Sequence, residues 1–228
     1  MRLALLLSLL ALSNFLLWGE IGALSAASRE RALYFLNVGE GDGSFARIEG
    51  ASLLVDGGPG AKAVYELEKV LRPMERRIDV VMLSHPNRDH YEGLIEVSKR
   101  YRVGVFVASA RESDDDSFHE LMATLRERNI RVVRLSAGDR LRYKGNILEI
   151  LSPTKELLRD RADNNASLVV RAEIGDLSAL LTGDIEKKAE TTLGKMYGDG
   201  LKSEILKVAH HGSRYSSSER FLEYARPS

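Results

Sequence analysis

The sequence contains no cysteine, few aromatic residues and no excess of charge of either sign. The lack of cysteine excludes disulfides, thiolate zinc clusters and a thiol nucleophile, so a metal site would have to use His, Asp, Glu, Asn or backbone oxygen. Lys and Arg together number 33, as do Asp and Glu. This balance argues against a dedicated duplex-binding domain, which gains its affinity by neutralising phosphates. A local basic rim around a catalytic site remains compatible with it.

The remaining composition is that of a globular protein with an apolar N-terminal segment. The 228 residues are 44% hydrophobic and 29% charged, enough for one large domain with a core. Residues 3–19 carry no charge, follow Arg2 and precede the small residues of "ALSAAS". This pattern predicts that residues 1–27 form a signal peptide or an uncleaved signal-anchor helix. Residues 28–228 would then form an extracytoplasmic domain that is secreted or anchored in the membrane.

After residue 30 the pattern alternates between short strands and amphipathic helices. Strands are expected at 33–38, 44–48, 52–55, 80–83, 103–108, 130–135, 140–143, 147–151, 167–174, 177–181 and 205–209. Helices are expected at 62–71, 93–101, 117–128 and 187–197, and from 217 onward. Each half of the chain begins with closely spaced strands and continues with helices, which predicts one α/β (α+β) domain of two packed sheets covered by helices.

Four of the five histidines follow predicted strands. The metal-competent side chains at three strand ends are His85, Asp89, His90, Asp184, His210 and His211. Imidazole and carboxylate ligands suit zinc, manganese or iron, and loops at strand ends are where a rigid scaffold presents functional groups. These residues predict a metal site; the alternative is that His85 and His90 only cap a helix. The fifth histidine, His119, is expected to be exposed on a helix.

The stretches that carry these residues resemble a known family. "FLNVGEGDGSF", "LLVDGG", "SHPNRDHYEGL", "LLTGD" and "LKVAHHGS" occur in this order in the metallo-β-lactamase superfamily. The chain after residue 32 resembles in particular the hydrolase domain of ComEC/Rec2-type competence proteins and its stand-alone relatives. The resemblance implies a four-layered αββα sandwich with one or two divalent ions (Zn or Mn) at an edge between the sheets. Because those relatives continue beyond the equivalent of Ser228, the domain is expected to be short at its C-terminal end, with the last strand of the sandwich in doubt.

The resemblance also implies a role for individual residues. The implied metal ligands are His85, Asp89, His90, the bridging Asp184 and His210; His211 is the alternative last ligand, or a proton donor. Asn87 and Asp163 occupy regions where many relatives have histidine, so they are possible additional ligands. Asp56 matches a buried aspartate that orients ligands, although a turn-forming role is the alternative, and Asp42 is expected near the rim of the site.

The function that the resemblance implies is that of an exported, metal-dependent phosphodiesterase or nuclease. A metal ion lowers the pKa of its bound water, and the resulting hydroxide would be the nucleophile. Asp89, Asp184 and His211 would be the catalytic side chains, and single-stranded DNA is the expected substrate. The alternatives are a hydrolase of another extracellular ester, and a non-catalytic, membrane-tethered binding module of a DNA-uptake assembly.

Overall fold

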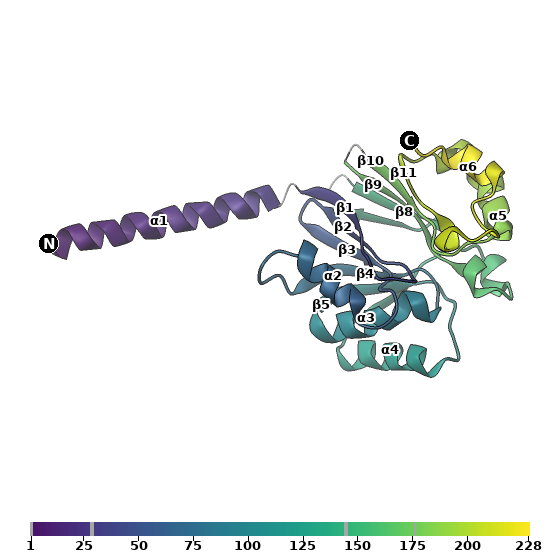
Figure 1. Ribbon diagram of the computed structural model, residues 1–228, viewed down its shortest axis with the longest axis horizontal. Coiled ribbons are helices and arrows are strands. Elements are labelled where there is room, and N and C mark those ends of the chain that lie inside the picture. Colours follow the sequence, from purple (N-terminus) through teal and green to yellow (C-terminus); the bar gives the residue numbers. More distant parts are fainter. Residues whose placement is uncertain (1, 28–29, 144–145, 176) are drawn as a thin grey trace.

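Two β-sheets pack face to face with helices on both outer faces, which confirms the predicted αββα sandwich (Figure 1). The computed structural model describes residues 2–27, 30–143, 146–175 and 177–228. The first sheet has the order β1-β2-β3-β4-β5-β6 and the second the order β11-β10-β9-β8-β7. Each sheet comes from one half of the chain, as the distribution of predicted strands indicated.

The first sheet changes from antiparallel to parallel pairing. Its strands are β1 (Arg31–Phe35), β2 (Ser44–Ile48), β3 (Ala51–Val55), β4 (Arg77–Leu83), β5 (Arg102–Ala108) and β6 (Val132–Arg134). β1, β2 and β3 pair antiparallel, and β3 to β6 pair parallel. The parallel pairs need crossover connections, which contain α2 (Lys62–Val70), α3 (Arg88–Arg100) and α4 (Asp116–Glu127). The carboxyl ends of the parallel strands therefore share one edge.

The second sheet ends in a parallel pair of strands. Its strands are β7 (Arg140–Tyr143), β8 (Asn146–Ser152), β9 (Val169–Ile174), β10 (Leu177–Leu181) and β11 (Ile205–Lys207). The crossover from β10 to β11 contains α5 (Lys187–Tyr197), and α6 (Glu219–Ala225) follows β11. Because β10 and β11 are parallel, with Leu181 opposite Lys207, the segments after both strands emerge side by side.

Three apolar layers hold the sandwich together. The first lies between the first sheet and its helices, the second between the two sheets, and the third between the second sheet and α5 and α6. Along β4, Val81 packs in the first layer and Met82 in the second, as expected for a strand whose side chains alternate between faces. Apolar layers therefore cover both faces of the central strands in each sheet.

Helix α3 begins at Arg88, five residues before the predicted start at Gly93. The prediction that Asp89 and His90 lie in a loop was therefore wrong, because both lie in the first turn of this helix. The Asn87 carbonyl accepts the N–H groups of His90 and Tyr91 and starts the turn. Gly93 is needed inside the helix for packing, since a Cβ there would lie 2.0 Å from the Gly57 carbonyl oxygen.

Helix α1 (Arg2–Ala27) extends away from the two sheets (Figure 1). Its described apolar side chains, such as Phe15 and Trp18, are exposed. Within the described residues, none of the helices combines the length and the hydropathy that a membrane span requires. The predicted boundary between residues 27 and 28 adjoins residues 28–29, which lie outside the described residues.

Candidate metal centre

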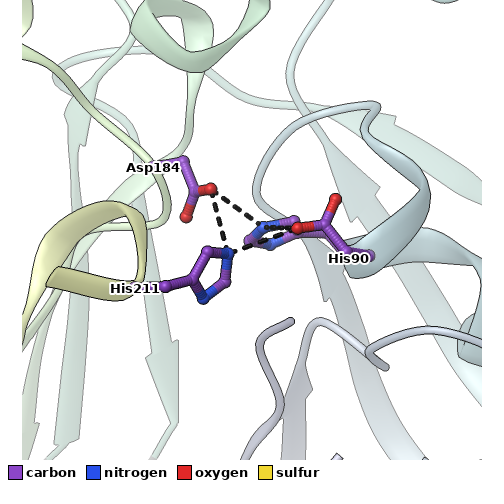
Figure 2. Close-up of side chains that lie close together, drawn as sticks. His90, Asp184 and His211 are labelled. Atoms are coloured by element: carbon purple, nitrogen blue, oxygen red, sulfur yellow. Dashed lines mark ion pairs between the residues drawn. The ribbon is translucent and has the colours of Figure 1, made fainter. Parts of the chain in front are cut away.

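Four side chains from three segments converge at the edge between the sheets. Asp89 and His90 come from the first turn of α3, Asp184 follows β10, and His211 follows β11. One ligand atom of each lies within 4.8 Å of those of the other three. Asp184 Oδ2 lies 3.2 Å from His90 Nε2 and 3.2 Å from His211 Nε2 (Figure 2). Asp89 Oδ2 lies 3.3 Å from His211 Nε2 and 3.6 Å from His90 Nε2.

The turns after β10 and β11 present the second half of this cluster. Gly183 has φ +53°, a left-handed conformation that suits glycine. His210 and His211 also adopt left-handed conformations, with φ +50° and +51°. Such values cost free energy for residues other than glycine and tend to occur at functional sites. In the Ala209–Gly212 3₁₀ segment the two consecutive imidazoles have different partners, since His210 Nδ1 faces Glu186 and His211 Nδ1 faces Asp42.

Asp56 holds His90 from behind. Its Oδ2 accepts a hydrogen bond from His90 Nδ1 at 2.9 Å, and its Oδ1 accepts one from the backbone N–H of Ser84 at 2.8 Å. The Asp56 side chain is 2% exposed and that of His90 is fully buried. Because a carboxylate can only accept, this contact places the Nδ1 proton toward Asp56 and leaves Nε2 facing Asp184.

Asp42 holds His211 in a similar way. Asp42 Oδ1 lies 3.4 Å from His211 Nδ1, while Oδ2 forms an ion pair with Lys207 Nζ. The loop that carries Asp42 packs closely on α3, since a Cβ at Gly41 would lie 2.3 Å from the Asp89 carbonyl oxygen. Asp56, which was predicted to orient ligands, and Asp42, which was predicted near the rim, thus each contact the Nδ1 side of an imidazole whose Nε2 faces the cluster.

The charges in the cluster stabilise one another in the metal-free protein. Hydrogen bonds to Asp184, Asp42 and Asp89 raise the pKa of His211 to about 11. Burial would lower the pKa of His90, but Asp56 and Asp184 outweigh it and raise the pKa to about 10. Burial opposes the ionisation of Asp184, yet the neighbouring imidazoles of His211 and His90 outweigh it and hold the pKa of Asp184 far below the usual range. A divalent ion would therefore displace protons from both imidazoles.

The donor atoms fit a divalent metal ion. His90 Nε2 and Asp184 Oδ1 are buried and have no hydrogen-bond partner within the described residues. His90 Nε2 lies close to Asp184 Oδ2 without forming a hydrogen bond, as expected when two ligand atoms point at a common position. Two imidazole nitrogens and two carboxylates form a ligand set that zinc and manganese accept.

The structure places the other predicted site residues around this cluster rather than in it. His85 packs its ring against His90 at a centroid distance of 4.2 Å, and burial lowers its pKa to about 3. His210 Nε2 lies 4.0 Å from Asp184 Oδ2, and its Nδ1 faces Glu186 at 3.7 Å. His211, the alternative last ligand, therefore occupies the position that the sequence analysis preferred for His210. His119 is exposed, as expected.

Neither of the two possible additional ligands joins the four-residue cluster. Asp163 forms an ion pair with Arg111 at 2.5 Å. Asn87 donates a hydrogen bond to Asn164 Oδ1 at 3.0 Å. Asn164 lies in the region where Asp163 was the preferred candidate, and Lys207 was not predicted from the sequence. A lysine in an otherwise apolar strand next to "HH" was the one available signal for Lys207.

Comparisons with known proteins identify relatives of the whole domain. Residues 37–228 match the metallo-beta-lactamase superfamily. The chain is 28% identical over 218 residues to ComE operon protein 3 of Bacillus subtilis, covering 88% of this chain and 28% of that protein. It is 31% identical to competence protein ComA of Neisseria gonorrhoeae, covering 87% of this chain and 26% of that protein. It is 30% identical to recombination protein 2 of Haemophilus influenzae, covering 84% of this chain and 23% of that protein. The chain thus spans about a quarter of the length of these relatives.

Solved structures with a similar fold are more distant in sequence. A B3 metallo-beta-lactamase with an active-site glutamic acid aligns with a TM-score of 0.59 at 14% identity, covering 85% of this chain and 83% of that one. The diiron β-hydroxylase CmlA of Streptomyces venezuelae aligns with a TM-score of 0.54 at 17% identity, covering 86% and 43%. At these identities the likeness establishes the fold alone.

Proposed function

Because this chain belongs to the metallo-β-lactamase superfamily, we propose that it is an exported, metal-dependent hydrolase of phosphodiesters. The observation that carries the proposal is the convergence of Asp89, His90, Asp184 and His211 within 4.8 Å of one another. Export rests on the apolar segment within residues 1–27, which would deliver the domain as a secreted or membrane-anchored protein.

The four converging side chains would hold the ion. A divalent ion bound there supplies a water of lowered pKa and positive charge against the substrate's oxygens. Asp56 and Asp42 would keep the Nε2 atoms of the two imidazoles available to the ion, as outer carboxylates do for metal-bound histidines. Asp89, whose side chain is 38% exposed, lies at the open side, where its carboxylate can accept a hydrogen bond from a water.

His210 is the side chain that we place against the substrate. Asn164 and Glu186 contact its Nδ1 side, so Nε2 faces the open centre, 4.0 Å from Asp184 Oδ2. Its side chain is 28% exposed, enough for a bound ester to reach it. An N–H donor in this position would stabilise negative charge on a phosphoryl oxygen. Sequence reasoning gave this role to His211, which lies within the four-residue cluster instead.

The substrate class rests on the relatives. Two of the three curated relatives above carry names that refer to competence or recombination, which favours DNA as the phosphodiester. Single-stranded DNA is the form that the resemblance in the sequence implies. The machinery would also serve a small extracellular phosphodiester. Zinc and manganese are both compatible with the donor atoms.

The test uses the full chain, loaded separately with Mn²⁺ or Zn²⁺, with bis-(p-nitrophenyl) phosphate and a single-stranded oligonucleotide as substrates. Asp184→Asn should lower both rates by a factor of about 100 or more, because it removes the carboxylate shared by His90 and His211. Asp79→Asn is the matched control, since Asp79 is a carboxylate on β4 that bonds Ser52 instead. An Asp184→Asn rate equal to that of the wild type would refute the mechanism. A metal-loaded wild type that cleaves neither substrate would favour the non-catalytic binding module.

A further inference from the structure

A hydrogen-bonded polar network lies beside the four-residue cluster. Asn87 Nδ2 donates to Asn164 Oδ1 at 3.0 Å. Asn164 Nδ2 donates to Glu186 Oε1 at 3.1 Å and lies 3.4 Å from His210 Nδ1. Asn87 precedes α3, and Asn164 lies in the 3₁₀ segment Asp163–Ala166. Glu186 precedes α5, and His210 follows β11. Both functional atoms of the Asn164 amide are therefore engaged by protein groups.

This network occupies the region where a second ion would have to find its ligands. The second ion would share Asp184 and take His85 as its one strong new donor. His85 Nε2 is buried without a hydrogen-bond partner, but His85 belongs to neither of the groups of three or more close acidic and imidazole ligands within the described residues. The neutral amide oxygen of Asn164 faces the Asn87 amide instead of an open position.

Carboxylates that could compensate the charge of a second ion are also committed elsewhere. Asp163 pairs with Arg111, which in turn donates to the carbonyl groups of Leu158 and Asp160. Glu186 accepts from Asn164. One buried imidazole and two amides bonded to each other form a poor ligand set for a divalent cation, which prefers charged or unengaged donors.

We infer that this chain holds a single divalent ion, on Asp89, His90, Asp184 and His211, and that the Asn87–Asn164–Glu186–His210 network takes the place of a second ion. The network then serves to fix His210 at the open side of the centre. This inference rests on the metal-binding part of the proposed function and does not depend on turnover.

The first test is the metal content of the full chain after loading with Mn²⁺ alone or Zn²⁺ alone, measured by mass spectrometry and by calorimetric titration. The wild type should bind one ion per chain. His85→Phe, which keeps a ring against His90, should still bind one ion with its affinity changed by less than about tenfold. His90→Phe should lose about 100-fold or more in metal affinity, because removing a ligand costs more affinity than removing a residue that only orients a ligand.

The second test asks whether a second position can be created. Asn87→His combined with Asn164→His would add two imidazoles next to His85, giving a three-histidine set, and should raise the content to two ions per chain. Arg126→His adds one imidazole on the exposed side of α4 and should leave the metal content at one ion per chain. Two tightly bound ions in the wild type, or loss of the ion in His85→Phe with the fold intact by circular dichroism, would overturn the inference. Neither result depends on hydrolysis: a one-ion chain without turnover would contradict only the proposed activity.

Discussion

Replacing Asp56 by asparagine should weaken metal binding while leaving the fold intact. Asp56 accepts from Ser84 N–H through one oxygen and from His90 Nδ1 through the other. Asparagine can keep the first bond, but its amide N–H₂ then faces His90 Nδ1 and favours the tautomer that has its proton on Nε2. The lone pair that a metal needs is thereby lost from Nε2. Changes of this kind behind a ligand typically cost about 10–100-fold in metal affinity, or about 1.4–2.7 kcal/mol.

The backbone at Asp56 makes asparagine the right substitution. Its φ is +60°, a conformation that asparagine tolerates and that costs alanine about 1–2 kcal/mol. Asp56→Asn should therefore melt close to the wild type, and Asp56→Ala clearly below it. Calorimetric titration with Zn²⁺ measures the affinity, with Asp79→Asn as a carboxylate control on the same sheet. An unchanged affinity in Asp56→Asn, or an equal loss in Asp79→Asn, would show that Asp56 does not act by orienting His90.

Three further outcomes follow from the described contacts. Burial would raise the pKa of Glu75, but hydrogen bonds from Arg47 outweigh it and lower the pKa. The contribution of the Arg47–Glu75 pair to the free energy of unfolding is therefore fully present above the unfolded-state pKa of about 4.3. It is lost as the pH falls through the lower folded-state pKa of Glu75. In urea titrations, Glu75→Gln should thus lower the free energy of unfolding by about 1 kcal/mol at neutral pH and by less at pH 3. The exposed Glu120→Gln should leave the free energy of unfolding unchanged at both pH values. His119→Ala should leave metal content and rate unchanged, and a large loss in either would mean that the ligand set is wrong. His210→Ala and His210→Asn should both lower turnover but not metal content, with the asparagine variant more stable by about 1 kcal/mol because φ at this position is +50°; full turnover in either variant would remove the imidazole from the mechanism.

Several strands were predictable because they are largely buried and bounded by turn residues. The predicted ranges 44–48 and 177–181 coincide with β2 and β10, and 140–143 coincides with the more exposed β7. The start of α3 was not predictable in this way. Gly93 resembles a helix boundary in the sequence, and the packing against Gly57 that explains it joins two segments that lie far apart in the chain.

Within the centre, the sequence identified the strand ends but not the residue that each turn presents. His210 and His211 have the same chemistry, adjacent positions and left-handed backbone conformations, so the sequence does not indicate that the imidazole of His211 lies nearer to Asp184. Asp163 and Asn164 pose the same difficulty, because a difference of one residue separates an ion pair with Arg111 from a bond to Asn87. Such choices depend on φ and ψ at single residues, which periodicity does not determine.

The position of the centre would give a bound ion a structural role as well as a chemical one. Asp89 and His90 belong to the half of the chain that forms the first sheet, and Asp184 and His211 belong to the half that forms the second. The layer between the two sheets is apolar, so these polar contacts add a link at its edge. An ion that binds only the folded chain stabilises it by about 4.1 kcal/mol when its free concentration is 1,000 times its dissociation constant. That gain is comparable with the whole stability of many domains, so an ion held by these four side chains would also link the two halves of the sandwich.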